Sequence, residues 1–288
     1  MSGFDRRFSL WGEIIGDPLS HALMTAVVHV MAQRRTRPLR ILEVGAWIGG
    51  SAATWSEALS RHHPPGGTIL CVDPWIRYPV DNAVHGAAFM ERYMAALDEG
   101  EAFRRFLQNI AALPHPVHPL RAPSDTALPL LRDGSFDIVY VDGDHSYDAC
   151  RGDLAEARRL VAPGGIVCGD DMDCLPQDVD AAFLAANRNK QPAIHPVTGA
   201  QFHPGVTLAV AEAFSVSVAH GFWCTERTPD GFAALPLAGL PVFVPQRFGA
   251  AMAAASQMER PGTINMTVTI LEGERRQGAI SSGAETET

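Results

Sequence analysis

Two acidic runs in this chain each follow a short apolar segment. Asp142-Gly143-Asp144-His145 follows residues 136–141, and Asp170-Asp171 follows residues 165–168. Short apolar runs of this kind are typical of buried strands in a parallel sheet. Because ligands of open α/β sheets bind beyond the carboxyl ends of the strands, we expect these acids to line an active site.

Carboxylates placed this closely need a cation or a proton. Two carboxylates about 4 Å apart repel by roughly 4 kcal/mol at an effective dielectric constant of about 20. Protonation or a bound cation relieves that repulsion. Mg²⁺ prefers oxygen ligands and needs only a few protein carboxylates. We therefore predict a divalent metal site formed by Asp142, Asp170 and Asp171, with helix capping or plain solvation of these acids as the alternative.

A glycine turn lies upstream of both acidic runs. We predict a strand at 39–44, a helix at about 51–61, and a second strand at 68–72 that ends at Asp73. This order is the outline of a nucleotide-binding half-fold. The dinucleotide fingerprint is Gly-x-Gly-x-x-Gly. The glycines here are Gly45, Gly49 and Gly50, and this different spacing disfavours NAD as the cofactor.

Further helices and strands must position these groups. Asp17 followed by Pro18 predicts the start of a helix that has one apolar face and ends in arginines. The helical stretch at 74–113 is longer than a crossover requires, so we predict that part of it forms a lid, with ordinary core packing as the alternative. The other predicted elements are a strand at 117–121, a short helix from Ser124-Asp125, a helix after Ser146, helices at 177–187 and from His203-Pro204, strands at 215–218 and 222–225, and an edge strand at 264–270.

Composition narrows the function classes. The chain has 288 residues, of which 47% are hydrophobic, and a net charge of -9. This charge, without a basic stripe, argues against nucleic acid or an anionic membrane as a partner. No apolar run resembles a leader or reaches the roughly 20 residues of a membrane span. Five cysteines without metal-type spacing favour a reducing compartment, so we predict a soluble, cytoplasmic protein.

We predict one domain over residues 1–270, with the lid at 74–113, and a disordered tail at 271–288. The oligomeric state stays open, although the strand at 264–270 can pair across a two-fold axis to form a homo-oligomer. His195 and His203 flank a polar loop at 189–201, and we interpret both as solvated loop residues.

Together these motifs resemble the class I S-adenosylmethionine-dependent methyltransferases. Glu43-x-Gly45-x-x-x-Gly49-x-Ser51 is similar to their first motif, in which glycines let the backbone approach the methionine part of the cofactor. An acid at Glu43 can also attract a cationic amine or sulfonium. The resemblance implies a Rossmann-like α/β fold with a mostly parallel, seven-stranded sheet flanked by helices. It implies that Asp73 binds the ribose hydroxyls, that Ser124 and Asp125 contact the adenine, and that Trp75 packs on the same ring. The full set of cofactor-binding residues that it implies is Glu43, Gly45, Gly49, Ser51, Asp73, Trp75, Ser124, Asp125 and Asp142.

The acidic runs resemble the divalent-metal-dependent O-methyltransferases, in the branch with macrolide-sugar methyltransferases and cephalosporin-hydroxylase-like proteins. The likeness covers about residues 39–175. It implies that Mg²⁺ or another divalent ion on the three aspartates binds two adjacent hydroxyls of a small polar acceptor, a sugar or natural-product glycoside. His145 would then accept the proton.

Three alternatives stay open. The protein can be a non-catalytic or metal-independent S-adenosylmethionine-binding protein, or a nicotinamide oxidoreductase. His145 can be a loop residue that only hydrogen-bonds a neighbouring carboxylate.

Overall fold

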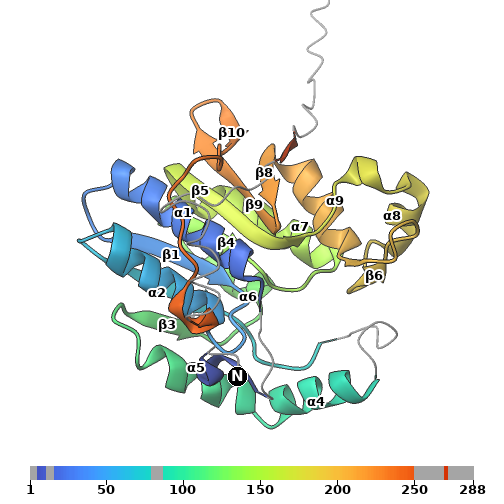
Figure 1. Ribbon diagram of the computed structural model, residues 1–288, viewed down its shortest axis with the longest axis horizontal. Coiled ribbons are helices and arrows are strands. Elements are labelled where there is room, and N and C mark those ends of the chain that lie inside the picture. The colour runs from blue at the N-terminus through green and yellow to red at the C-terminus, as the bar shows by residue number, and fades with distance from the viewer. Residues whose placement is uncertain (1–4, 11–15, 79–86, 250–268, 272–288) are drawn as a thin grey trace, which may run out of the picture.

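The computed structural model contains one large sheet with helices on both faces (Figure 1). It describes residues 5–10, 16–78, 87–249 and 269–271. The strands of the large sheet are β1 (Leu39–Val44), β2 (Gly67–Val72), β3 (Val117–Leu120), β4 (Phe136–Val141), β5 (Val161–Met172), β8 (Val216–Ala219), β9 (Gly221–Thr228), β10 (Gly231–Ala234) and β11 (Thr269–Leu271).

The helices confirm most of the predicted positions, to within a few residues. They are α1 (Pro18–Arg34), α2 (Gly50–His62), α4 (Ala87–Asp98), α5 (Glu101–Ile110), α6 (Ser124–Ala127), α7 (Tyr147–Leu160), α8 (Ala181–Asn187) and α9 (Pro204–Ala213). Four single 3-10 turns are η1 (Arg6–Phe8), η2 (Leu128–Leu130), η3 (Pro176–Asp178) and η4 (Gln246–Phe248). Within the described ranges, none of these helices combines the length and the apolar character that crossing a membrane requires.

The order of the strands is β11-β8-β9-β5-β4-β1-β2-β3. The five strands from β3 to β5 in this order are parallel, while β9 is antiparallel to both β5 and β8. The Rossmann-like fold is therefore confirmed. The chain leaves β1 toward β2 and later returns to β4 on the other side, so the sheet has its topological switch point between β1 and β4. Ligands of open α/β sheets bind at such a point.

The number of strands that the resemblance implied was wrong, because the described residues form a sheet of nine strands instead of seven. One addition is β10, which pairs with β9 through a turn at Thr228-Pro229-Asp230-Gly231. Pro, Asp and Gly favour such turns, so the sequence did carry a signal for this hairpin. The other is β11, whose Ile270 pairs with Ser217 of β8. It confirms the end of the predicted edge strand, while residues 264–268 and the predicted tail lie outside the described residues.

Apolar side chains of the central strands alternate between two cores. Ile41 of β1 belongs to the core under α1 and α2, whereas Leu42 belongs to the core under α7 and α9. Strands that are buried on both faces read as nearly continuous apolar runs, which is why the sequence located them well.

The first helix differs from its prediction. Asp17 caps α1 as expected, because its Oδ1 accepts hydrogen bonds from the backbone N–H of Leu19 and Ser20. However, residues 20–28 are all buried, so the helix has no solvent face there. The segment at 242–248 covers the side that the sheet leaves open, and Phe243 N–H donates to Thr25 Oγ1 at 3.2 Å. No local pattern reveals a cover from more than 200 residues away.

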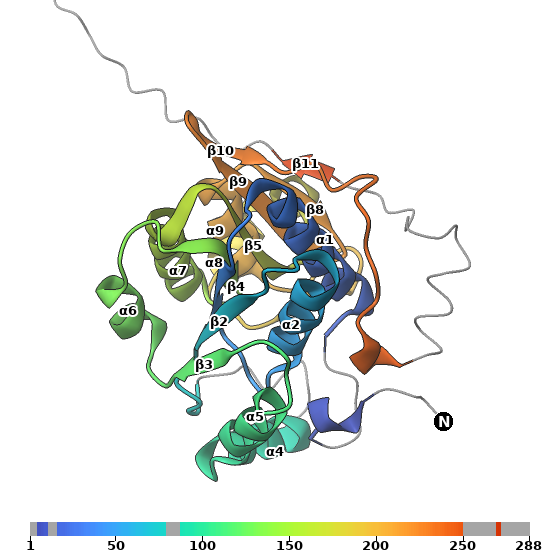
Figure 2. The ribbon, with the colours of Figure 1, turned by 90° about the vertical axis from the view of Figure 1, so that its left-hand side faces the viewer.

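The predicted lid stretch divides into two packed helices (Figure 2). Phe106 of α5 is fully buried in the core against Trp75, so α5 follows the core-packing alternative. Tyr93 and Leu97 of α4 instead line a cavity. Residues 79–86 lie outside the described residues, and a lid motion of α4 stays a prediction. Further along, the predicted helix at 177–187 is split into η3 and α8, and the loop at 189–201 carries a small ribbon of β6 (Ala193–Ile194) and β7 (Gln201–Phe202).

A buried carboxylate fixes the amino ends of β1 and β4. Arg37 donates two hydrogen bonds to Asp137, at 2.7 and 2.8 Å, and Arg40 N–H donates at 3.0 Å. The side chain of Asp137 has no exposed surface. Burial alone would raise the pKa of Asp137, but the hydrogen bonds from Arg37 and Arg40 hold this pKa below its ordinary value. Asp137 therefore stabilises the folded state as a carboxylate.

We predict that Asp137→Ala lowers the free energy of unfolding by about 2 kcal/mol, because Arg37 and the Arg40 N–H lose a buried acceptor. Urea unfolding at pH 7 measures this loss. The pKa of Asp137 is lower in the folded state, so its contribution is complete above the unfolded value and disappears as the pH falls through the folded value.

The matched control for this prediction is Asp133→Ala. Asp133 also pairs with an arginine, Arg159, but its side chain is 72% exposed. Exposed pairs of this kind contribute roughly 0–1 kcal/mol. Equal losses in the two variants would contradict the role given to Asp137.

Candidate active site

A cavity of about 800 Å³ lies at the carboxyl ends of β1, β2 and β4. Its walls come from the segments that follow these strands, from α4, and from parts of the chain near both termini. Most of the predicted site residues line it. These are Gly45, Ser51, Asp73, Ser124, Asp125, Asp142, His145 and Asp170. The other predicted residues, Glu43, Gly49, Trp75 and Asp171, are not part of the lining.

The glycine turn packs directly against the end of β4. Gly45 has a φ of +83°, and a Cβ built on it would lie 1.9 Å from the carbonyl oxygen of Asp142. The Asp142 N–H also donates to Val44 O at 2.8 Å. Only glycine allows both this backbone conformation and this close approach. The turn therefore brings the end of β1 into contact with the first acidic run.

Asp73 connects the glycine turn to the end of β2. Its Oδ2 accepts hydrogen bonds from the N–H groups of Ala46 and Trp47 at 2.9 and 3.0 Å, and its Oδ1 accepts one from Trp75 N–H at 2.6 Å. A carboxylate offers about four acceptor positions. Asp73 therefore shapes the turn and still has acceptor capacity toward the cavity for hydroxyl groups of a ligand.

Glu43 is fully buried beneath the turn. Ser51 Oγ donates a hydrogen bond to Glu43 Oε1, and Cys71 Sγ lies 3.8 Å from Glu43 Oε2. Burial is the main cause that raises the pKa of Glu43 to about 8. Glu43 is therefore largely protonated at pH 7. Here it orients Ser51 in the first turn of α2, and its predicted attraction to a cation would require the carboxyl group to ionise first.

Trp75 does not reach the cavity. Its side chain is 1% exposed, its Nε1–H donates to Trp47 O at 2.6 Å, and its ring packs on Phe103 and Phe106. The next residue, Ile76, lines the cavity instead. Gly49 faces Phe106 as well, because a Cβ on Gly49 would lie 3.3 Å from that ring. The structure thus gives the predicted packing of Trp75 on an adenine ring no support.

Ser124 and Asp125 lie at the start of α6, as predicted, and they line the cavity opposite α7. The sequence analysis missed Asp153 of α7. This residue lines the same wall, interacts with Ser124, and has a pKa that burial raises to about 7. Nothing in the local sequence distinguishes Asp153 from an ordinary exposed helical acid.

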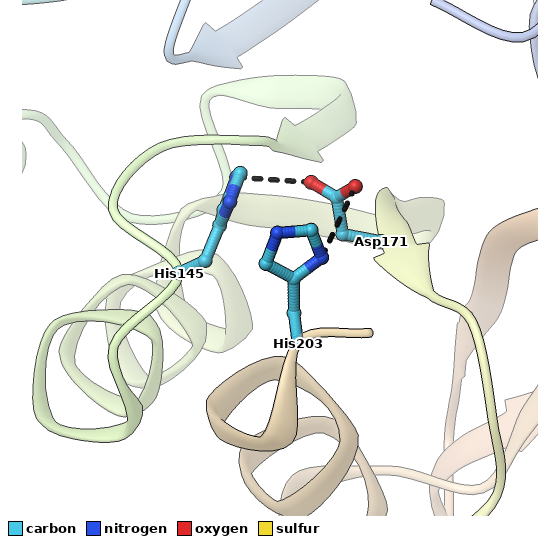
Figure 3. Close-up of side chains that lie close together, drawn as sticks. All are labelled: His145, Asp171 and His203. Atoms are coloured by element: carbon cyan, nitrogen blue, oxygen red, sulfur yellow. Dashed lines mark ion pairs between the residues drawn. The ribbon is translucent and has the colours of Figure 1, made fainter. Parts of the chain in front are cut away.

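The acidic runs meet around the imidazole of His145. Figure 3 shows its contact with Asp171. His145 Nε2 lies 3.0 Å from Asp171 Oδ2 and 3.4 Å from Asp142 Oδ1. Tyr140 OH donates to Asp142 Oδ2 at 3.3 Å. One nitrogen therefore bridges two of the three predicted metal ligands, while the third, Asp170, lines the adjoining cavity.

An irregular end of β5 separates the two neighbouring aspartates. The predicted strand at 165–168 is longer in the structure, so Asp170 and Asp171 belong to β5 itself. The pairing of β5 with β9 shifts between Gly169 and Met172, and Asp171 has a φ of +65°. A strand irregularity of this kind redirects side chains. Asp170 consequently lines the cavity, and Asp171 contacts His145.

His203 is a site residue that the sequence analysis dismissed. Its Nδ1 lies 3.5 Å from Asp171 Oδ1 and 3.2 Å from Asp173 Oδ2, and its ring is 4.6 Å from that of His145 (Figure 3). One potential metal-ligating atom from each of His145, Asp171 and His203 lies within 4.8 Å of the other two. At this separation the three residues can hold a metal ion. Its position just before Pro204, at the start of α9, is the only sequence signal for this role.

Charge in this cluster is balanced by protons as the structure stands. Burial raises the pKa of Asp142, and burial together with Asp171 and Asp142 raises that of Asp170 well above its ordinary value. Burial would lower the pKa of His145, but Asp171 and Asp142 raise it well above the ordinary value. His145 thus carries the positive charge that these acids need. The base role predicted for His145 requires Nε2 to lose this proton first.

We predict that Gly45→Ala destabilises the protein by about 2–4 kcal/mol, because the new Cβ meets the Asp142 carbonyl and the left-handed backbone is strained. Thermal or urea unfolding measures the change. Gly152→Ala serves as the control, because nothing lies within 4 Å of a Cβ at Gly152. In this helix interior alanine should stabilise by up to about 1 kcal/mol, so a loss in both variants would contradict the argument.

We predict that the difference in free energy of unfolding between Glu43→Gln and the parent protein shifts in favour of the variant as the pH rises from about 4.5 toward 8. The folded-state pKa of about 8 exceeds the unfolded value of 4.5, so the parent loses stability over this interval, whereas glutamine does not titrate. Urea unfolding at a series of pH values measures the difference. Glu99→Gln, at an exposed position, should leave the pH profile unchanged. A pH-independent difference for Glu43→Gln would refute a buried, protonated Glu43.

Comparisons with known proteins agree with this geometry. Residues 42–172 match the family described as "Methyltransferase domain". Comparison with curated protein sequences gives no match. Among solved structures, the chain is similar to the O-methyltransferase NovP, with 22% identity, a TM-score of 0.47, and coverage of 74% of this chain and 81% of that one.

Two further solved structures are similar in the same way. A putative O-methyltransferase from Klebsiella pneumoniae gives 19% identity and a TM-score of 0.41, covering 77% of this chain and 86% of its own. The 1,6-didemethyltoxoflavin-N1-methyltransferase of Burkholderia thailandensis gives 14% identity and a TM-score of 0.40, covering 74% and 80%. The matched residues 42–172 contain β1 to β5 with the glycine turn and both acidic runs. Residues 42–172 are therefore similar to a methyltransferase domain, and they lie within a Rossmann-like α/β fold.

Proposed function

We propose that this protein is an S-adenosylmethionine-dependent O-methyltransferase that acts on a hydroxyl group of a small polar acceptor with adjacent hydroxyls. The observation that carries the proposal is one continuous cavity that combines two kinds of wall. The glycine turn and Asp73 form one part of this cavity, and Asp142, His145 and Asp170 form another. A methyl donor and a hydroxyl acceptor that share the cavity would meet near the acids.

The first part of the cavity suits a nucleoside. Asp73 has acceptor capacity for two ribose hydroxyls, and Ser124 and Asp125 add polar groups across the cavity. The turn is held close by two backbone hydrogen bonds to Asp73, from Ala46 and Trp47. Holding both reactants in one geometry is much of the catalysis of a methyl transfer, since the oxygen must approach the methyl carbon in line with the departing sulfur.

The second part suits a divalent cation. Asp142 and Asp171 already converge on one positively charged group, and Asp170 lines the adjoining cavity. Carboxylate oxygens are the ligands that Mg²⁺ prefers. We propose Asp142, Asp170 and Asp171 as its ligands. When bound, the ion would lower the pKa of an acceptor hydroxyl.

His145 is placed to handle the proton of that hydroxyl. Its backbone is fixed because Gln191 Oε1 accepts from His145 N–H at 3.2 Å, while Gln191 Nε2 donates to Asp144 Oδ1 at 2.7 Å. In the reaction that we propose, the acceptor oxygen forms a bond to the methyl carbon as the carbon–sulfur bond breaks. The hydroxyl proton passes to the neutral imidazole of His145, and the products are the methyl ether and S-adenosylhomocysteine.

A second candidate is a metal-independent S-adenosylmethionine-binding protein. One observation favours it: His145 lies between Asp142 and Asp171 and offsets part of their negative charge without a metal. A nicotinamide oxidoreductase is disfavoured by the spacing of Gly45, Gly49 and Gly50.

We predict that S-adenosylhomocysteine binds in a calorimetric titration and that Asp73→Asn weakens this binding by about 10-fold, because a hydrogen bond to a charged group contributes about 1.5–3 kcal/mol. Addition of Mg²⁺ to the saturated protein with a vicinal diol should give a second binding signal. Asp142→Asn and Asp170→Asn should remove this second signal. Asp133→Asn, which changes an exposed and remote acid, should keep both signals.

The outcomes separate the candidates. Cofactor binding and a metal signal that depends on the acids, followed by a methylated diol in mass spectrometry, support the metal-dependent transferase. Cofactor binding without any metal signal in the presence of the diol favours the metal-independent protein. Failure of S-adenosylhomocysteine to bind refutes both.

A further inference from the structure

We infer that His145, Asp171 and His203 form a binding site for a divalent ion that prefers nitrogen ligands, such as Zn²⁺. This set differs from the three aspartates proposed above for Mg²⁺, with which it shares only Asp171. The binding of the ion does not rest on the proposed function, whereas its effect on the reaction does.

The three side chains converge from different elements (Figure 3). Asp171 lies near the end of β5, His145 precedes α7, and His203 directly precedes α9. His145 Nε2 lies 3.0 Å from Asp171 Oδ2, and His203 Nδ1 lies 3.5 Å from Asp171 Oδ1. Neighbouring ligands of a tetrahedral zinc ion are roughly 3.3 Å apart, because the zinc–ligand bonds are about 2.0–2.1 Å long. Each histidine thus already has the spacing to Asp171 that ligands of one ion have.

The Nε2 atom of His145 lacks an aligned partner. It is buried, and no acceptor in the described part of the chain lies in line for a hydrogen bond, although Asp171 Oδ2 is only 3.0 Å away. A buried polar atom without a well-directed partner is costly. An ion between Nε2 and the carboxylate would satisfy both atoms.

Two carboxylate oxygens lie near His203 Nδ1. Asp173 Oδ2 is 3.2 Å from this nitrogen, and Asp171 Oδ1 is 3.5 Å from it. A carboxylate only accepts, so Nδ1–H donates to Asp173. A divalent ion would replace this proton, as metal binding to histidine generally requires. Two neutral imidazoles with Asp171 and Asp173 would then balance the charge of the ion.

The ligand types determine which ion is preferred. Zn²⁺ binds imidazole nitrogen and carboxylate oxygen, and three protein ligands suffice for it. Mg²⁺ takes oxygen ligands and keeps several waters. Two imidazoles and one carboxylate therefore favour Zn²⁺ over Mg²⁺ at this position.

The packing of α9 holds the two histidines together. Gly205 is the second residue of this helix, and a Cβ on it would lie 2.3 Å from the backbone oxygen of His145 and 2.5 Å from Tyr147 N. The start of α9 therefore lies directly against the backbone that carries His145. The rings of His145 and His203 are consequently 4.6 Å apart between their centroids. Ligands that are positioned in advance reduce the entropic cost of binding.

A second cavity borders the same cluster. Its volume is about 280 Å³, and its lining includes Asp173, Asp178 and His220. Asp173 contacts His203, while His145 lines the larger cavity. The cluster is thus adjacent to both cavities, so an ion has a route to it when the larger cavity holds a ligand.

We predict that the protein binds one Co²⁺ ion per chain with the visible absorption of a four- or five-coordinate site. Zn²⁺ should displace this Co²⁺, and Mg²⁺ at the same concentration should not. His203→Asn should weaken both Co²⁺ and Zn²⁺ at least about 10-fold, because loss of a group that merely supports a metal ligand already costs roughly 10- to 100-fold. Asparagine keeps a side-chain N–H for Asp173 but has no imidazole. Visible absorption and calorimetry measure these affinities.

His118→Asn is the matched control, because His118 is exposed on β3. This variant should bind Zn²⁺ as the parent protein does. Asp170→Asn separates the two ions, since it should remove the Mg²⁺ signal predicted above and leave Zn²⁺ binding unchanged. Thermal unfolding in the presence of a chelator verifies that each variant is folded. His145→Asn tests the other imidazole if His203→Asn does not fold.

The proposed reaction supplies a second readout. An ion on His145 Nε2 would block the atom that accepts the hydroxyl proton, so Zn²⁺ should inhibit methyl transfer to the diol, and His203→Asn should relieve this inhibition. Failure of the parent protein to bind Zn²⁺ would refute the site. Unchanged Zn²⁺ affinity in the histidine variants, or displacement of Co²⁺ by an equal concentration of Mg²⁺, would also refute it. If the parent protein does not bind S-adenosylhomocysteine, the proposed function fails, and Zn²⁺ binding still decides the site.

Discussion

The site depends on one electrostatic constraint, the gathering of carboxylates at the carboxyl ends of the central strands. Asp73, Asp142, Asp170 and Asp171 follow or end three strands of the same sheet, and each pair of such charges costs several kcal/mol in a partly desolvated site. Different neighbouring groups compensate for this repulsion at each aspartate. Three backbone N–H groups satisfy Asp73, whereas His145 bridges Asp142 and Asp171. Asp170 has its pKa raised. In the function that we propose, a bound cation would replace the proton that His145 holds.

The opposite end of the sheet shows how the same residue type acts as a purely structural group. Asp137 is the second residue of the strand that Asp142 follows, and its side chain is fully buried. Arginine side chains and a backbone N–H saturate its oxygens and lower its pKa. At the carboxyl end, burial together with neighbouring acids raises the pKa of Asp142 and Asp170, whereas His145 and His203 lower the pKa of Asp171. The contrast lies in the neighbours, and it separates a stabilising carboxylate from one that is available for chemistry.

The cavity is assembled from segments that are remote in sequence. The glycine turn reaches the Asp142 carbonyl only because Gly45 lacks a Cβ, and this contact brings the turn to the acids. Segments near both termini then close the other side of α2 through Asp5, His21 and Arg247. The segment at 242–248 also covers α1, whose residues 20–28 are all buried. Substitutions far from the acids, in the segment at 242–248, are therefore expected to alter the cavity wall as well as the stability of α1.

The sequence by itself determined the parallel strands, the glycine turn, the cap at Asp17 and the acids at strand ends, because strand burial, backbone conformation and helix capping are local properties. Tertiary structure alone decided which groups meet. His203 joins Asp171 from a helix about 30 residues further along, and Arg247 meets His21 across more than 200 residues. The Trp75 side chain lies in the core because Phe103 and Phe106 pack against it. Local patterns report what one segment prefers, whereas contacts, burial and pKa values depend on which distant segments pack against it.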